Sequence, residues 1–300
     1  MSLTCTRIEN FDVDGDLTLA ADLRYGNLTL TAVPGLSRVL VTIQATGTRA
    51  EEVADSVAVT AGPRRVDIEV PKTARFLGAA TSLRLRVEVP EGTDLHIASG
   101  SGDVDAIGGY RAVEAHLGSG DVRVDHARRA DIGTGSGNVR LGTAARAELH
   151  TGSGSIIVED IGELRAGTGS GVIRARAVTG ALEASTGSGS IGVAQLAGAG
   201  RVETGSGSVR IGDVDGDVDA TTGSGSIAID RLRGGRVSTN TASGSQRIGV
   251  AEGTALKVDA NSVSGRVTSE LGQVSDGEGF ARTAEVVARS ISGGITFRRA

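Results

Sequence analysis

The stretch HTGSGSIIVEDIGELRAGTGSGVIRA, residues 150–175, contains Thr-Gly-Ser-Gly twice, seventeen residues apart. A fixed period of this length is the signature of stacked structural units. With the second Gly of Gly-Ser-Gly as a marker, copies at steps of seventeen or eighteen residues lie at Gly102, Gly120, Gly137, Gly154, Gly171, Gly189, Gly207 and Gly225. Ala-Ser-Gly, Val-Ser-Gly and Ile-Ser-Gly replace the motif in degenerate copies at Gly244, Gly265 and Gly293.

Each unit alternates apolar and polar residues around its glycines, which predicts strands rather than helices. Two positions after the marker, an apolar column is expected to face inward: Val104, Val122, Val139, Ile156, Ile173, Ile191, Val209 and Ile227. Charged residues occupy the positions between the apolar columns and are expected to face outward, as Arg174 does beside Ile173. The content of 2% aromatic residues fits a thin interior filled by aliphatic side chains.

Two short strands in seventeen or eighteen residues make one coil of a parallel β-solenoid, with about 4.8 Å between coils. The chain is therefore predicted to be all-β, with a parallel β-helix of about eleven coils over residues 96–300. Parallel crossovers are strongly biased to one hand, so the helix is expected to be right-handed.

The corner motif adds a column of threonines three positions before the marker, with the parity of the inward residues. We expect these threonines, and the serine one position before each marker, to form hydroxyl ladders inside a tight corner where Gly supplies unusual dihedral angles. The threonines are Thr134, Thr151, Thr168, Thr186, Thr204 and Thr222.

Residues 1–95 lack the repeat, yet segments such as GDLTLAADL and SLRLRVEV still alternate like strands. They are predicted to form a β-sandwich-like cap on the first coil, because an open solenoid end exposes unpaired strand edges. One short helix is expected in RAEEVADSV, residues 49–57.

Composition narrows the classes of function. The net charge of −5 offers no basic face for nucleic acid. No run of eighteen apolar residues and no secretory leader pattern occurs, so we expect no membrane partner and a cytoplasmic location. The single cysteine, Cys5, excludes an intramolecular disulfide.

The chain resembles a bacterial family of β-strand-repeat proteins known as "putative adhesins" of unknown function. The resemblance is carried by FDVDGDLTLAADLRYGNLTL, by EVPEGTDLHIASGSGDVDA, by successive TGSGSI coils, and by KVDANSVSGRV and SISGGITFRR near the end. It implies a β-helix and no established reaction.

Carboxylates are the strongest catalytic candidates. Asp103 and Asp121 stand one coil apart in one outward column, as in β-helix enzymes that cleave acidic polysaccharides, and mutual repulsion would raise the pKa of one of them. Arg123 close by and the scarcity of aromatic platforms favour a charged, solvated face instead. No catalytic residue is therefore assigned.

Metal and cofactor sites find little support. Asp213, Asp215 and Asp217 resemble the start of an EF-hand loop, but the turn Gly stands one place early and Ser224 occupies the place of the twelfth-position Glu. His116 and His150 lie two coils apart, about 9.6 Å, which is too far for one metal ion. The Gly-Ser-Gly runs lack the Lys of a phosphate-binding loop, so no cofactor and no metal is expected.

A column of outward threonines would suit an ice-binding surface, but their parity places them inside. The sequence thus predicts a non-enzymatic solenoid scaffold or interaction protein that binds another protein or itself. A polysaccharide-binding or polysaccharide-cleaving β-helix and a surface adhesin remain as alternatives.

The end of the chain, SISGGITFRRA, indicates where a self-contact would lie. Phe297 is expected to plug the open last coil or contact a second copy, giving a homodimer through the C-terminal coils. Arg298 and Arg299 are expected to discourage open-ended stacking by repulsion. The segment LGQVSDGEGFART, residues 271–283, is the alternative cover for this end.

Overall fold

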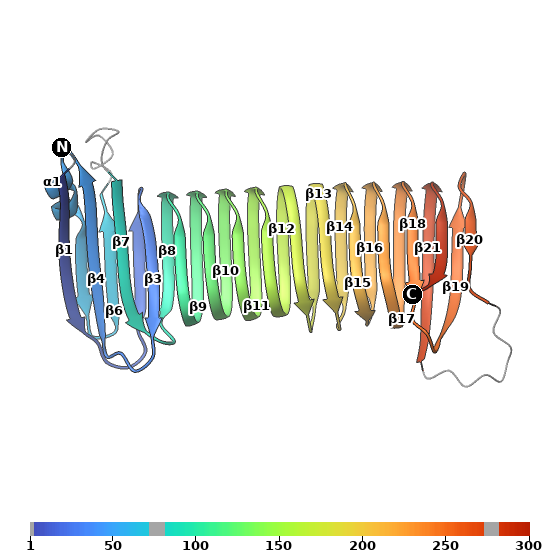
Figure 1. Ribbon diagram of the computed structural model, residues 1–300, viewed down its shortest axis with the longest axis horizontal. Coiled ribbons are helices and arrows are strands. Elements are labelled where there is room, and N and C mark those ends of the chain that lie inside the picture. Colours follow the sequence, from blue (N-terminus) through green and yellow to red (C-terminus); the bar gives the residue numbers. More distant parts are fainter. Residues whose placement is uncertain (1–2, 72–81, 273–281) are drawn as a thin grey trace. The chain divides into compact units, whose positions relative to one another are not determined.

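The computed structural model describes residues 3–71, 82–272 and 282–300. Within these ranges the chain is almost entirely β-structure, which confirms the all-β prediction (Figure 1). The helix α1 (Ala50–Ser56) lies where the sequence predicted it. No helix in the described ranges is long and apolar enough to span a membrane. The chain divides into two compact units, unit 1 (Met1–Thr151) and unit 2 (Gly152–Ala300).

The repeated coils of unit 1 pair in parallel at the interval of the motif. Leu95 lies opposite Val113, and Val104 lies opposite Val122, so each strand rests on the next copy of itself. In each coil an A strand precedes the Gly-Ser-Gly corner and a B strand follows it. These coils contain β8 (Asp94–Ser101), β9 (Val104–Ser119), β10 (Val122–Ser136) and β11 (Val139–Ser153).

The N-terminal strands continue this parallel stack instead of forming a separate layer. Strand β2 pairs in parallel with both β6 and β8, and β3 does so with β7 and β9. Within the described residues, antiparallel pairs join β1 with β4, β4 with β7, and β5 with β6. The strands are β1 (Leu3–Asp12), β2 (Thr18–Leu23), β3 (Asn27–Val33), β4 (Arg38–Gly47), β5 (Ala58–Gly62), β6 (Arg65–Val70) and β7 (Ser82–Pro90).

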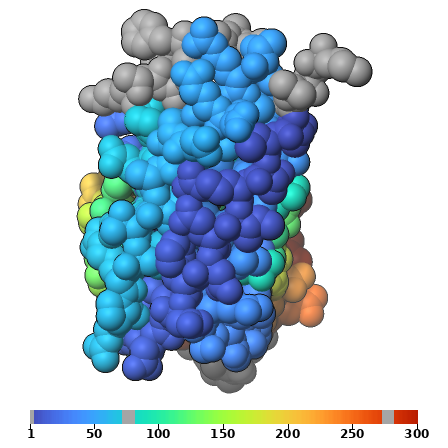
Figure 2. Space-filling model, turned by 90° about the vertical axis from the view of Figure 1, so that its left-hand side faces the viewer, coloured from blue at the N-terminus to red at the C-terminus, as the bar shows by residue number. Residues whose placement is uncertain are grey.

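A β-sandwich-like cap over residues 1–95 is therefore not confirmed. Alternating apolar residues predict strands but not their pairing, and the Gly26 turn serves as a corner: a Cβ on Gly102 would lie 2.1 Å from the Gly26 carbonyl oxygen. Figure 2 shows the end of unit 1 that the N-terminal segment, in shades of blue, forms. The boundary at residue 95 falls inside unit 1 and stays a prediction.

Unit 2 repeats the same coil. Ile191 lies opposite Ile173 and Val209, and Ile227 follows Val209 in the same column. The A-strand column of Leu182, Gly200, Val218 and Val237 runs beside it in the same way. The strands are β12 (Ile156–Val178), β13 (Leu182–Leu196), β14 (Gly200–Ser206), β15 (Val209–Asp215), β16 (Val218–Ser224), β17 (Ile227–Ser243) and β18 (Gln246–Val250).

The last coils of unit 2 are stacked out of sequence order. Strand β21 pairs with β17 on one side and β19 on the other, and β22 lies between β18 and β20. The coil of β21 and β22, which comes last in the sequence, therefore lies between the coil of β17 and β18 and the coil of β19 and β20. The coil of β19 and β20 is the terminal coil in space. These strands are β19 (Thr254–Ser262), β20 (Val267–Ser269), β21 (Arg282–Ser292) and β22 (Ile295–Arg299).

The predicted inward column is the core of both units. Its members are 0–1% exposed, Val104, Val122 and Val139 in unit 1 and Ile156, Ile173, Ile191, Val209 and Ile227 in unit 2. Arg174, the neighbour of Ile173, is exposed. The facing predicted from the alternation is therefore confirmed.

The threonine ladder is also confirmed, and every hydroxyl in it except that of Thr186 donates to the carbonyl of a corner glycine in the preceding coil. Thr151 donates its hydroxyl to the Gly137 carbonyl at 3.0 Å, and Thr222 donates to the Gly207 carbonyl at 3.2 Å. The predicted serine ladder is wrong: Ser119 and Ser136 are exposed. The glycine that follows each of these serines has a positive φ, 128° at Gly120, and marks the corner, so the alternation does not continue through it.

Candidate functional site

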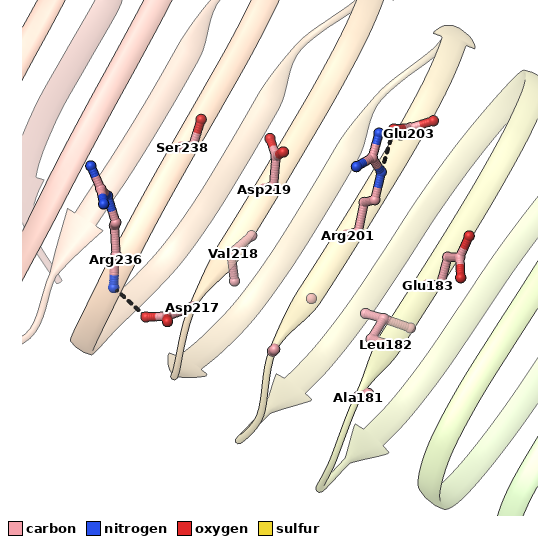
Figure 3. Close-up of a pocket in the computed structure, with 12 residues that line it drawn as sticks. Ala181, Leu182, Glu183, Arg201, Glu203, Asp217, Val218, Asp219, Arg236 and Ser238 are labelled. Atoms are coloured by element: carbon pink, nitrogen blue, oxygen red, sulfur yellow. Dashed lines mark hydrogen bonds and ion pairs between the residues drawn. The ribbon is translucent and has the colours of Figure 1, made fainter.

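A shallow hollow on the outer face of unit 2 gathers charged side chains (Figure 3). It has a volume of about 720 Å³ and lies across the A strands β13, β14, β16 and β17. Its lining consists of Ala181, Leu182, Glu183, Ala199, Gly200, Arg201, Glu203, Asp217, Val218, Asp219, Arg236 and Ser238. Four carboxylates and two guanidinium groups among these residues give the hollow an acidic excess.

Gly200 lies in the floor of the hollow. It occupies the inward column of Leu182 and Val218 and is buried, so a side chain at this position would point into the core. Leu196 fills that space, with its Cδ2 atom 2.6 Å from where a Gly200 Cβ would be. The floor of the hollow is therefore closely packed from the core side.

Most charges in the hollow have partners within the protein. Arg201 forms an ion pair with Glu203 at 2.6 Å, and this hydrogen-bonded contact raises the pKa of Arg201. Glu183 accepts from Arg165 at 2.7 Å, and Asp217 accepts the backbone N–H of Arg236 at 2.8 Å. These contacts fix where the charges lie.

Asp219 differs from these residues. It lies opposite Arg201 in the strand register and contributes to the raised pKa of that guanidinium, but within the described residues no hydrogen bond or ion pair holds its carboxylate. In Figure 3 its side chain stands on the outer face between the Arg201–Glu203 pair and Ser238. A carboxylate held on a rigid strand between paired charges is available to a cation from outside.

The two catalytic candidates serve the coil itself. Asp103 Oδ1 accepts the backbone N–H of Asp121 at 3.0 Å, and Asp121 Oδ1 accepts the backbone N–H of Asn138 at 2.8 Å. Asn27 begins the series by accepting the Asp103 N–H at 3.2 Å. The residue after each of these three corners therefore caps the next coil, a role that the one-coil spacing of Asp103 and Asp121 could have indicated.

The three EF-hand-like aspartates turn to three different partners. Asp213 pairs with Arg233 at 3.2 Å and Asp215 with Arg282 at 2.8 Å, whereas Asp217 caps the backbone of β17. In residues 3–71, 82–272 and 282–300, no three His, Cys, Asp or Glu side chains are grouped so that they could hold a metal ion.

The histidines form pairs that the sequence reasoning missed. His96 Nδ1 lies 3.0 Å from Glu114 Oε2, and His116 Nε2 lies 3.6 Å from the other oxygen of the same carboxylate. His150 lies 3.4 Å from Glu148. The first pair follows from the eighteen-residue register, which places Glu114 opposite His96.

The placement of Phe297 corrects the sequence-based prediction of an end contact. Its side chain is 1% exposed and lies in register between Ile248 and Ser269. It therefore neither plugs the open end nor presents a surface. The prediction assumed that the last coil in sequence is the last in space.

The two following arginines lie on the outside. Arg298 is exposed, and Arg299 donates to the carbonyl oxygens of Ala251 and Thr254 at 3.1 and 3.2 Å. Most of the alternative cover, the segment 271–283, lies outside the described residues.

Comparison with known families gives a clear match. The family described as Toastrack DUF4097 matches residues 41–200 and, a second time, residues 182–290. Together these ranges span most of the chain. No curated protein matches the sequence.

Several solved structures are similar over nearly their whole length, at low identity. A "putative adhesin" from Bacteroides fragilis is 13% identical, with 97% of both chains covered and a TM-score of 0.37. A "putative lipid binding protein" from Parabacteroides distasonis is 12% identical, with 97% of this chain and 96% of that chain covered and a TM-score of 0.36. A "putative adhesin" from Parabacteroides merdae is 10% identical, with 96% and 95% covered and a TM-score of 0.34.

Proposed function

The chain belongs to the Toastrack DUF4097 family, and on this premise we propose that it is a non-enzymatic scaffold that binds another protein through the outer face of its A strands. The observation that carries the proposal is the Asp219 carboxylate in the hollow, which lies near Arg201 but is held by no hydrogen bond or ion pair within the described residues. Rigid strands hold it in place without further ordering, which lowers the entropic cost of binding.

The charge of the hollow indicates the chemistry of the partner. An acidic excess favours a protein surface that presents Lys or Arg, because complementary potentials speed association and exclude wrong partners. Arg guanidinium suits a carboxylate best, since it can donate two parallel hydrogen bonds. The stacked A strands extend the contact beyond the hollow, as concave and flat faces of solenoids do.

The capping contacts of Asp103 and Asp121 support a scaffold over a polysaccharide-cleaving enzyme. Both carboxylates are hydrogen-bonded to backbone N–H groups of the neighbouring coil. Protonation or nucleophilic attack by either group would disturb the corner that it stabilises.

The proposal includes the remaining architecture and location. We infer right-handed coils of seventeen or eighteen residues, residues 1–95 as a cap that protects the first coil, a homodimer formed near the C-terminal coils, and a cytoplasmic location. The hand is supported by the general bias of parallel crossovers.

The test compares the chain with its Asp219→Lys variant in pull-downs from the native cell lysate. Captured proteins are identified and their affinities measured with purified components at two salt concentrations. We expect at least one protein to bind about tenfold more weakly to Asp219→Lys and to be salt-sensitive, because a desolvated carboxylate–guanidinium pair has become a repulsive contact.

Asp131→Lys is the matched control, since Asp131 stands at the corresponding position of an A strand in unit 1. A partner set unaffected by Asp219→Lys would contradict the assigned surface. Binding to acidic glycans in a parallel array, with no protein partner captured, would favour the polysaccharide alternative.

A further inference from the structure

The terminal coil of unit 2 ends in an unpaired strand edge. Strand β19 pairs with β21 on one side, and the described residues provide no strand on its other side. Val258 and Val267 carry the inward parity of this coil, yet both are 43% exposed. An exposed edge with apolar side chains is a template for pairing with another strand.

The free edge presents the backbone groups of the inward residues. In earlier coils the inward residue donates its N–H toward the following coil, as Leu164 does to Ala181 at 2.9 Å and Leu182 to Ala199 at 2.8 Å. By the same parity, Leu256, Val258 and Ala260 direct their N–H and C=O groups away from β21. Val258 can therefore exchange two hydrogen bonds with one residue of an antiparallel strand.

The side chains of β19 are self-complementary about Val258. In antiparallel pairing centred there, Lys257 lies opposite Asp259 of the second copy, and Asp259 lies opposite Lys257 of the second copy. Val258 meets Val258, and Leu256 meets Ala260, so the apolar columns of both copies face each other. Opposite charges and aliphatic pairs across strands each stabilise a sheet.

Other registers lose this match. Centring one residue earlier places Lys257 opposite Lys257 of the second copy, and centring one residue later places Asp259 opposite Asp259. Pairing between positions of opposite parity would set apolar side chains against charged ones. Only the register centred on Val258 joins unlike charges and like apolar columns.

We propose that β19 is a homodimer interface, in which two copies pair antiparallel about Val258 and each closes the open core of the other. The inference deepens the proposed function and rests on it in one respect, that the chain is an interaction protein. A two-fold contact of this kind is closed, so it gives dimers and not filaments.

The charged residues of this interface are already held in place. Arg289 donates to Asp259 Oδ1 at 2.8 Å, and this hydrogen bonding lowers the pKa of Asp259, which keeps the carboxylate ionised. Lys257 lies 3.3 Å from Glu285, with its ammonium still largely exposed. Both can meet the second copy without breaking these contacts.

The experiment is sedimentation of the full chain over a range of concentrations. We expect a monomer–dimer equilibrium whose dissociation constant rises about tenfold or more in Lys257→Asp, because two pairs of like charges then face each other. The double exchange Lys257→Asp with Asp259→Lys restores the opposite charges between the copies but sets like charges beside Arg289 and Glu285 within each copy, so partial recovery of the dimer is expected.

Arg174→Asp supplies the same change of charge on an inner coil and should leave the equilibrium unchanged. A parent that stays monomeric, a dimer indifferent to Lys257→Asp, or open-ended assembly would each overturn the inference. Partner capture by the Asp219 hollow is scored separately, so a monomer that still binds its protein partner refutes the dimer alone.

Discussion

The inner coils of unit 2 and its terminal coil carry the same kind of inward side chain but bury it to different extents. Val237 in β17 and Val258 in β19 share one column, with Val286 of β21 between them. Val237 is fully buried, whereas Val258 is 43% exposed. Burial in a solenoid is thus supplied by the next coil, and the last coil lacks that neighbour.

The difference in burial suggests that the inner coils stabilise the fold and that the terminal coil is suited to interaction. The inner coils have strand partners on both edges and contribute core and outer charges, including the hollow around Asp219. The terminal coil retains unpaired backbone groups and exposed valines, features that suit pairing with a second copy. Substitutions at matched positions in the two regions test this division.

The largest effect is expected from a charge placed in the inner core. Ile173→Asp buries a carboxylate between coils and should lower the free energy of unfolding by about 4 kcal/mol or more. Val267→Asp, in the same column of the terminal coil, should cost far less because water reaches that site. Urea denaturation measures both, with exposed Arg174→Asp as the control; equal losses at the two core positions would contradict the comparison.

A valine-to-alanine substitution in each region tests the same difference in burial with a smaller change. Val237→Ala should lower the free energy of unfolding by about 2 kcal/mol, from lost burial and a residual cavity. Val258→Ala should cost about half as much in dilute protein, where β19 is unpaired. Chemical denaturation at low concentration gives the ratio, and a larger loss for Val258→Ala would show that β19 is already covered.

The hydroxyl ladder predicts a smaller difference. Thr222→Val keeps the shape of the side chain but leaves the part-buried Gly207 carbonyl without this donor, which should lower the free energy of unfolding by about 1 kcal/mol. Ser262 takes the corresponding place in the terminal coil and bonds the Gly293 carbonyl at 2.9 Å in a less buried setting. Ser262→Ala should lower the free energy of unfolding by only a few tenths of that amount, because water can replace the lost hydrogen bond. Thermal melts of both variants measure the two losses.

The smallest effect concerns pH. Hydrogen bonds from Arg111 lower the pKa of Asp94, so the ionised form stabilises the fold above the ordinary aspartate pKa of about 3.9, and this stability is lost as pH falls through the lowered value. The contribution is under about 1 kcal/mol, because water screens the pair.

Arg111→Gln should flatten this acid dependence more than Arg289→Gln, which frees the more exposed Asp259 of the terminal coil. Free energies of unfolding between pH 3 and 6 measure this acid dependence for both variants. A larger flattening in Arg289→Gln than in Arg111→Gln would contradict the comparison.

The repeat, the inward columns and the threonine ladder could be predicted from the sequence, because strand alternation fixes which way a side chain faces. The prediction failed for Ser119 and Ser136, since a glycine corner breaks that alternation. It also failed for Phe297, because sequence order does not fix stacking order when a connection is long enough to let β21 enter beside β17.

The candidate site was less accessible to prediction. The carboxylates of Asp103 and Asp121 were singled out as a pair, but their partners are backbone N–H groups, which a side-chain pattern does not show. The hollow depends on which outward residues of neighbouring coils lie side by side, and the availability of Asp219 depends on which neighbouring charges already have partners. Both features can be recognised only when the pairing register of the strands is known.

Residue-resolved hydrogen exchange at several protein concentrations tests the central claim most directly. The amides of Leu256, Val258 and Ala260 should exchange quickly in dilute protein and become protected as the concentration rises, while inward amides such as Leu182 stay protected throughout. Lys257→Asp should keep the β19 amides fast at every concentration. Amides of β19 that are equally protected in dilute protein, or that remain fast in concentrated protein, would contradict an open terminal coil that a second copy closes.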